Sequence, residues 1–168
     1  MSIIISNIRQ IHISYVSNTT IRAKGSDMAK IEELREKYLA LDSNQSGLDN
    51  LEIDPNCLIS FDYEYPEQES NIIIDSDEFT AVCPWTGLPD QGTLTIKYTP
   101  DLKVLELKSL KYYLLSYRQV GIVQEHAINR ILKDLVEICQ PKKMLLTLDY
   151  NIRGGLHTEV QVNYVAED

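Results

Sequence analysis

The order in which strand-like and helix-like segments follow one another constrains the fold of this chain most. Strand-like segments, in which apolar and polar residues alternate, start near residue 57; two helix-like segments follow, and two more strand-like segments end near residue 164. Strands grouped in this way form antiparallel sheets, with the helices gathered on one face. The sequence therefore predicts an α+β fold in which an antiparallel sheet carries two helices on one face.

The boundaries of these segments follow from their apolar period and from the proline and glycine residues between them. Residues 57–65 predict a half-buried strand with Cys57, Ile59, Phe61, Tyr63 and Tyr65 on one face. Further strands are predicted at 78–82, 92–98, 103–107, 144–151 and 156–164, and helices at 109–117 and 123–139. Residues 84–92 predict a loop, and residues 152–155 predict the turn between the last two strands.

Residues 1–50 differ from the rest and predict an N-terminal extension, with one folded domain over residues 51–168. Within the extension, Ile31, Leu34, Tyr38 and Leu41 lie at helical spacing and predict a helix over residues 29–41. The polar residues 42–50 are typical of a linker.

The charge of the chain excludes some partners. Its 16 basic and 25 acidic residues give a net charge of −9, which repels a phosphate backbone and disfavours direct binding to nucleic acid. No apolar run is long enough to cross a bilayer, and the N-terminal residues are a poor match to a signal peptide. We therefore expect a cytoplasmic protein without a membrane partner.

The cysteine and histidine residues indicate free thiols and no metal site. Cys57, Cys83 and Cys139 are odd in number and lack the spacing of a metal-binding pair, so a disulfide framework is not expected in the cytoplasm. The three histidines are scattered along the chain, and no two of them have the spacing of zinc ligands.

Cys83 is the first candidate for chemistry because it lies where a strand meets a loop rich in proline and glycine. An ordinary thiol is only about 3% thiolate at neutral pH, so a nucleophilic cysteine needs help from its surroundings. Asp90, at the far side of the loop, could exchange a proton with it. From spacing alone, a small buried thiol and a turn residue are the favoured interpretation.

Charged residues near the two helices could bind a cofactor or a base. Lys108 and Lys111 lie one helical turn apart and could hold a phosphate, although from this pattern alone a solvated helix face is the favoured interpretation. Glu125 lies near the start of the second helix, where the helix dipole favours a carboxylate. Its carboxylate could equally accept hydrogen bonds from a ring N–H and an exocyclic amine of a purine-like base. Arg153 precedes two glycines and could bind an anion, but such a sequence is more often a simple hairpin turn.

Four runs of sequence together resemble the 7-cyano-7-deazaguanine reductases of queuosine biosynthesis. They are FTAVCPWTGLPDQGTLTIKYTPD, LELKSLKYYLLSYR, GIVQEHAIN and NIRGG, and they occur in the order of that family. The resemblance covers about two thirds of the chain, roughly residues 57–164, and is to the short, single-module members. It leaves residues 1–50 as an extension and makes residues 51–168 a catalytic domain of the tunnelling-fold type.

The resemblance implies a role for each candidate. Cys83 would be the nucleophile that adds to the nitrile carbon as a thioimide, and Asp90 the proton donor. The substrate would contact Leu105, Glu106, Leu107, Gln124 and Glu125, with Glu125 as the anchor of the deazaguanine ring. Lys108 and Lys111 lie in the motif associated with NADPH, and Arg153 is a candidate phosphate contact. Many members have histidine where this chain has Gln124, which can bind a base but cannot relay a proton as imidazole does.

The implied activity is reduction of the nitrile of 7-cyano-7-deazaguanine to an aminomethyl group with two NADPH. Covalent attachment to sulfur makes the nitrile carbon a better hydride acceptor. The implied fold is the tunnelling fold, whose subunits close into a barrel with sites between them, so a homo-oligomer is expected.

Three alternatives stay open at this point. An amidinotransferase would use the same thioimide with ammonia and act on tRNA, which the retained LELKSLKYY run and the acidic charge disfavour. A cyclohydrolase-like enzyme acting on pterins would need zinc ligands. A non-catalytic module that binds a purine-like base would bind its ligand even with alanine in place of Cys83.

Overall fold

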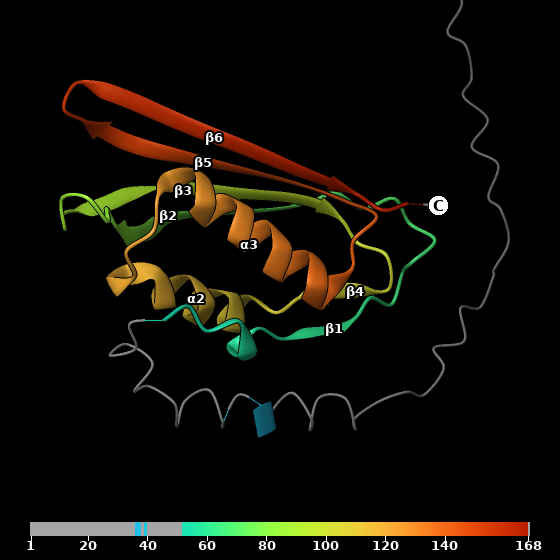
Figure 1. Cartoon of the computed structure of the whole chain (residues 1–168). Coiled ribbons are helices and arrows are strands. Elements are labelled where there is room, and N and C mark those ends of the chain that lie inside the picture. The colour runs from blue at the N-terminus through green and yellow to red at the C-terminus, as the bar shows by residue number, and fades with distance from the viewer. Residues whose placement is uncertain (1–35, 38, 40–51, 168) are drawn as a thin grey trace, which may run out of the picture.

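The protein has two layers, a four-stranded antiparallel sheet and a layer of helices. The computed structural model describes residues 36, 37, 39 and 52–167. The sheet has the strand order β2-β3-β5-β6, formed by β2 (Ile72–Val82), β3 (Pro89–Thr99), β5 (Lys143–Arg153) and β6 (Leu156–Val165). The helices α2 (Leu107–Leu115) and α3 (Gln124–Cys139) lie on the same side of this sheet (Figure 1). The predicted antiparallel sheet with two helices on one face is therefore confirmed.

The core lies between the sheet and the helices. Helix α3 buries Ala127, Ile128, Ile131 and Leu135 completely, at the helical spacing that the sequence predicted. It packs against β5 and β6, while α2 packs against β2. The sheet contributes every second residue of its central strands, among them Leu94, Ile96, Leu146 and Leu148. Burial of each such side chain contributes about 1.5–3 kcal/mol to folding.

The strand predicted over residues 57–65 is mostly wrong. Residues Pro55–Cys57 form a short 3-10 helix (η2), and only Ser60–Asp62 (β1) is a strand, paired with β4 (Lys103–Leu105). Phe61 and Tyr65, which the alternation placed on the buried face, are 40% and 61% exposed. The strand is short because its partner β4 has only three residues to pair with before the chain continues as a helix.

The boundary between β4 and α2 also differs from the prediction. Glu106 was expected to lie in a strand over residues 103–107, but it is the N-cap of α2, and Leu107 is already helical. The Glu106 carboxylate accepts from the backbone N–H groups of Lys108 at 2.9 Å and Ser109 at 2.7 Å. A carboxylate at this position satisfies N–H groups that have no partner within the helix. The rest of the predicted helix is 3-10 helix η3 (Ser116–Gln119).

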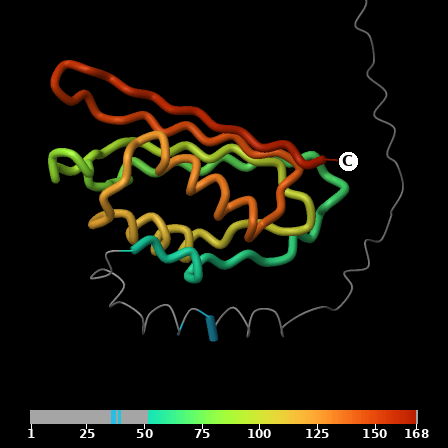
Figure 2. The backbone as a smooth tube through the Cα atoms, viewed as in Figure 1, coloured from blue at the N-terminus to red at the C-terminus, as the bar shows by residue number. Residues whose placement is uncertain are grey.

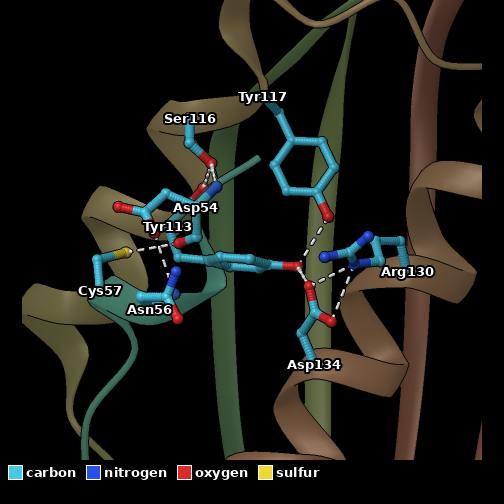
Figure 3. A network of polar contacts seen from close by, with 8 residues as sticks. All are labelled: Asp54, Asn56, Cys57, Tyr113, Ser116, Tyr117, Arg130 and Asp134. Atoms are coloured by element: carbon cyan, nitrogen blue, oxygen red, sulfur yellow. Dashed lines mark hydrogen bonds and ion pairs between the residues drawn. The ribbon is translucent and has the colours of Figure 1, made fainter. Parts of the chain in front are cut away.

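A buried polar network fixes the helices to one another (Figure 3). The Asp134 carboxylate of α3 accepts from the Tyr113 hydroxyl of α2 at 2.8 Å and from Nε of Arg130 at 2.7 Å. The Tyr113 and Tyr117 hydroxyls lie 2.7 Å apart, which brings η3 into the network. Burial raises the pKa of both tyrosines, so the hydroxyls stay protonated. Among the described residues, no buried side-chain nitrogen or oxygen lacks a hydrogen-bond partner, as a buried polar cluster requires.

One end of the sheet carries two projecting connections. Figure 2 shows that the β5–β6 hairpin and the connection between β2 and β3 reach out at the same end, where α3 also begins. The hairpin turns through Gly154 and Gly155, whose φ angles of 59° and 79° need glycine, so the predicted turn is confirmed. This end holds Cys83, Gln124 and Arg153.

The N-terminal predictions fall largely outside the described residues. Glu36, Lys37 and Leu39 are helical and exposed, within the helix predicted over residues 29–41. The rest of that helix, the linker and the domain boundary near residue 50 lie outside the described residues and stay predictions. Within the described part, no helix is long and apolar enough to span a membrane.

Candidate active site

Cys83 follows β2 and opens a short, closed loop. Its backbone N–H donates to the Leu88 carbonyl, and its carbonyl accepts from the Gly87 N–H, each at 2.9 Å. Gly87 has a φ of 68°, a left-handed conformation that glycine adopts without strain. The loop is shorter than the predicted 84–92, because β3 begins at Pro89 and Asp90 therefore lies in a strand. Both ends of the loop are thus anchored in paired strands, and the position of the thiol is fixed by them.

Backbone pairing brings the start of α3 beside this loop. The Val82 N–H donates to the Val120 carbonyl, and the Ile122 N–H donates to the Val82 carbonyl, each at 3.0 Å. The result is a parallel bridge between Val82 and Gly121, only one residue before Cys83. Helix α3 begins three residues further on, so Gln124 and Glu125 are held near the thiol.

Arg153 arrives from the last hairpin. Its guanidinium forms an ion pair with Asp90, and its Nη2 donates to Oγ1 of Thr86 at 3.0 Å. Asp90 is only 6% exposed, and a buried carboxylate of this kind requires a charged or hydrogen-bonded partner. The sequence proposed a phosphate contact for Arg153. In the structure its guanidinium is occupied by Asp90 and Thr86, and the phosphate contact stays a prediction.

These segments enclose a hollow of about 190 Å³. Its lining residues are Cys83, Pro84, Trp85, Asp90, Val123, Gln124, Glu125 and Arg153. Five of the ten residues singled out from the sequence are among them, and they come from three separate parts of the chain. A thiol, two carboxylates, an amide and a guanidinium therefore line one small volume.

The surroundings of Cys83 favour its thiolate. A hydrogen bond from the Thr86 hydroxyl is the main cause, followed by Arg153 and the backbone of Trp85, and together they lower the pKa of Cys83 to about 7. Close to half of the molecules would then carry a thiolate at neutral pH, against about 3% for an ordinary cysteine. By contrast, burial raises the pKa of both Cys57 and Cys139 to about 12.

Tyr150 contacts the start of α3 close to the residues of the hollow, and the sequence did not single it out. Its side chain is buried, and its hydroxyl donates weakly to the Gln124 carbonyl at 3.4 Å. Burial and the nearby Asp90 and Glu125 carboxylates raise its pKa. Across the sheet, Tyr150 pairs with Gly92, where an added Cβ would lie 2.5 Å from the Asp149 carbonyl oxygen. Glycine at this position allows β3 and β5 to approach closely under the site.

The other five sequence candidates do not line the hollow. They lie around the start of α2 and are Leu105, Glu106, Leu107, Lys108 and Lys111. The Glu106 carboxylate is the helix cap described above, Leu107 is 60% exposed, and Lys111 forms an ion pair with Glu78 of β2. Thr86 and Trp85 were not chosen as candidates, although both stand in the run of residues around Cys83. Among residues 52–167, no three His, Cys, Asp or Glu side chains cluster as metal ligands do.

Comparisons with known proteins add a family and an activity. The family model described as QueF-like protein matches residues 89–168. A protein of Caldanaerobacter subterraneus subsp. tengcongensis is 56% identical over 69% of this chain and 87% of its own length. A protein of Thermoanaerobacter pseudethanolicus is 56% identical over 68% of this chain and 86% of its own length. A protein of Chlorobaculum tepidum is 53% identical over 62% of this chain and 89% of its own length. All three are named NADPH-dependent 7-cyano-7-deazaguanine reductase.

A solved structure shares the fold. The apo form of an archaeosine synthase, QueF-Like, superposes with a TM-score of 0.55 at 21% identity, over 60% of this chain and 99% of the other. At that identity the likeness concerns the fold alone.

Proposed function

The chain belongs to the family of the NADPH-dependent 7-cyano-7-deazaguanine reductases, and on this premise we propose that it reduces the nitrile of 7-cyano-7-deazaguanine to an aminomethyl group. It is an NADPH-dependent oxidoreductase, as its relatives are. One observation carries the proposal: Cys83, with a pKa lowered to about 7, shares a hollow with Asp90, Glu125 and Arg153.

Cys83 is the nucleophile in this proposal. Its sulfur forms a bond to the nitrile carbon, one π bond of the carbon–nitrogen triple bond breaks, and the nitrogen takes up the proton that the thiol released. The product is a covalent thioimide, whose carbon accepts a hydride more readily than the nitrile does. The lowered pKa supports this role because it supplies the attacking thiolate at neutral pH.

Asp90 is the proton carrier. It is buried beside Cys83 in the hollow, and Arg153 holds its carboxylate in place through the ion pair. It would take the thiol proton and deliver it to the nitrile nitrogen. Thr86, which contacts the guanidinium and lowers the pKa of the thiol, is a positioning residue for both groups.

Glu125 and Gln124 are proposed to hold the deazaguanine ring. Glu125 is in the first turn of α3, and no other described residue donates a hydrogen bond to its carboxylate, so both oxygens can accept from the ligand. A ring N–H beside an exocyclic amine matches two such oxygens. Gln124 is half-buried at the same rim and offers an amide to the base.

The cofactor groups and the quaternary structure complete the proposal. NADPH, when bound, supplies the hydrides for the two reductions. The ammonium groups of Lys108 and Lys111 suit its phosphates, and Leu105, Glu106 and Leu107 would meet the substrate. Because all five lie around the start of α2 rather than at the hollow, we propose that subunits assemble as a homo-oligomeric barrel with each site completed by a neighbour. We place the enzyme in queuosine biosynthesis in the cytoplasm, with residues 51–168 as its catalytic domain.

The first experiment separates the thioimide from the reduction. Full-length protein is mixed with 7-cyano-7-deazaguanine without NADPH, and the intact mass is recorded together with an ultraviolet difference spectrum. We expect a mass gain of one substrate in the wild type and in Cys139→Ala, and none in Cys83→Ala. NADPH is then added and its oxidation is followed, with two NADPH expected per aminomethyl product.

Two results would contradict the proposal. Active, oligomeric protein that forms no adduct would leave a base-binding module as the better function. An adduct that ammonia converts to an amidine, with no oxidation of NADPH, would make the protein an amidinotransferase.

A further inference from the structure

Trp85 is the most exposed large apolar side chain at the hollow. It is 85% exposed, and it is the only tryptophan of the chain. A tryptophan carries one of the largest apolar surfaces of any side chain, and in folded proteins most of that surface is covered. Its exposure beside Cys83 therefore indicates that something planar or apolar covers it in the working protein.

The loop holds Trp85 in place, so its exposure does not come from a loose segment. The hydrogen bonds from Cys83 to Leu88 and from Gly87 to Cys83 close the loop on both sides of it. The Leu88 N–H also donates to Oγ1 of Thr86 at 3.3 Å, directly after Trp85. The backbone of Trp85 contributes to the environment of the Cys83 thiol. The backbone that carries the indole is thus held two residues from the proposed nucleophile.

The lining of the hollow is divided by chemistry. Trp85, Pro84 and Val123 are its apolar residues, whereas Glu125, Gln124 and Arg153 are polar. A flat heteroaromatic ring needs both, because its edge carries hydrogen-bonding groups and its faces stack on aromatic rings. The Glu125 carboxylate can accept hydrogen bonds from the edge of such a ring. Trp85 is the aromatic lining residue that can stack on one of its faces.

We propose that Trp85 stacks on the flat face of the bound base and determines the affinity of the site for bicyclic heteroaromatic nitriles. The inference rests on the proposed function for the identity of the substrate. Stacking of a base on one aromatic side chain changes affinity by roughly 5- to 150-fold. The contact is remote from the bonds that form and break, so it acts on KM for the nitrile and leaves kcat nearly unchanged.

The test uses the single tryptophan as its own probe. Full-length protein is titrated with 7-cyano-7-deazaguanine without NADPH, and tryptophan emission and intact mass are recorded on the same samples, with free tryptophan amide correcting for absorption by the ligand. We expect quenching that saturates together with the adduct. Steady-state kinetics should show KM raised roughly 5- to 150-fold in Trp85→Leu, little changed in Trp85→Phe, and unchanged in Leu88→Ala, an exposed side chain of the same loop.

The outcomes separate this inference from the proposed function. An adduct that forms without quenching, or a Trp85→Leu variant with the KM of the wild type, overturns the role of Trp85 and leaves the reductase intact. Quenching without any adduct supports stacking and overturns the reductase. Emission that shifts on dilution of ligand-free protein would place Trp85 in a contact between subunits and overturn the inference.

Discussion

The thiols of Cys83 and Cys139 differ by about five pKa units within one small domain, about 7 against about 12. Both are buried, at 8% and 0% exposure. Cys139 ends α3 among core side chains, and its thiol donates to the Leu135 carbonyl at 3.1 Å. Cys83 lies at the end of the sheet, where Thr86 and Arg153 donate to it. Burial raises the pKa of Cys139, whereas at Cys83 the hydrogen bonds from Thr86 and Arg153 outweigh the smaller effect of burial and lower the pKa.

The contrast extends to the regions around the two thiols. The core beneath α3 buries apolar side chains and one fully paired cluster around Asp134. The end of the sheet instead gathers charged groups from three separate parts of the chain around an open hollow. Packing in the core stabilises the fold, and the stable fold in turn holds the polar groups at the end of the sheet close together.

The largest expected effect is on alkylation of the three cysteines. At pH 7 Cys83 should react with iodoacetamide at least about 100-fold faster than Cys57 or Cys139, because its thiolate fraction is about 5 × 10⁴-fold larger while its intrinsic nucleophilicity is lower. The rate at Cys83 should fall about tenfold per pH unit below 7 and level off above it, since a lowered pKa preserves the thiolate down to that pH. Peptide mapping by mass spectrometry measures this, and equal labelling of all three would remove the contrast.

Thr86→Val should produce the next largest effect. The substitution keeps the shape and removes the hydroxyl that contributes most to the lowered pKa of Cys83. Complete return to an ordinary thiol would decrease the thiolate fraction at pH 7 from about one half to about 3%, roughly a 15-fold loss of adduct formation rate. Thr86→Ser, which keeps the hydroxyl, is the matched control. A pH profile unchanged by Thr86→Val would show that this hydroxyl does not act on the sulfur.

Arg153→Lys should have a smaller effect of the same sign. Arginine is the second contributor to the lowered pKa, and lysine keeps its charge but loses the fork that reaches both Asp90 and Thr86. We expect the adduct to form on the order of fivefold more slowly at pH 7, the value of about one hydrogen bond. Arg118→Lys, an exposed arginine of η3, serves as the control. Stopped-flow absorbance would measure both rates, and equal rates would show that the Arg153 guanidinium does not act on the Cys83 sulfur.

The smallest effect belongs to the core thiol. Cys139→Ala should lower the free energy of unfolding by about 1 kcal/mol, because one buried sulfur is removed and a small cavity stays. Activity should be unchanged. Urea unfolding measures the free energy of unfolding, and NADPH oxidation measures the activity. Loss of activity in a stably folded Cys139→Ala protein would break the division between the two regions.

Much of the fold could be predicted from the sequence because its signals are local. The apolar period of α3, ended by Pro141, and the Gly154–Gly155 turn were placed within a residue or two. The strand over residues 57–65 failed because its length depends on β4, and β4 is short because Glu106 caps a helix. A side chain that closes a helix instead of continuing a strand is not visible in the alternation around it.

The family resemblance identified residues of the site from three separate parts of the chain, among them Gln124, Glu125 and Arg153, whereas the local pattern alone could relate only neighbours in the chain. Cys83 and Asp90 flank one loop, and the family resemblance identified them together. Tyr150 was missed because it comes near the site through the pairing of β3 with β5. The start of α3, whose residues Gln124 and Glu125 were identified, is brought to Cys83 by the bridge from Val82 to Gly121, which no local pattern predicts. Such pairings are set by the whole sheet. The positions of Lys108 and Lys111 relative to NADPH stay a prediction.

The ion pair between Asp90 and Arg153 also has a consequence during synthesis of the protein. The two residues are 63 positions apart, and the guanidinium comes from one of the last strands to leave the ribosome. A growing chain that has not yet reached Arg153 lacks one of the groups that lower the pKa of Cys83. We therefore expect the nascent thiol to resist oxidation and unwanted alkylation better than the finished one. Ribosome-bound chains ending before and after the β5–β6 hairpin would show this as a step in labelling rate.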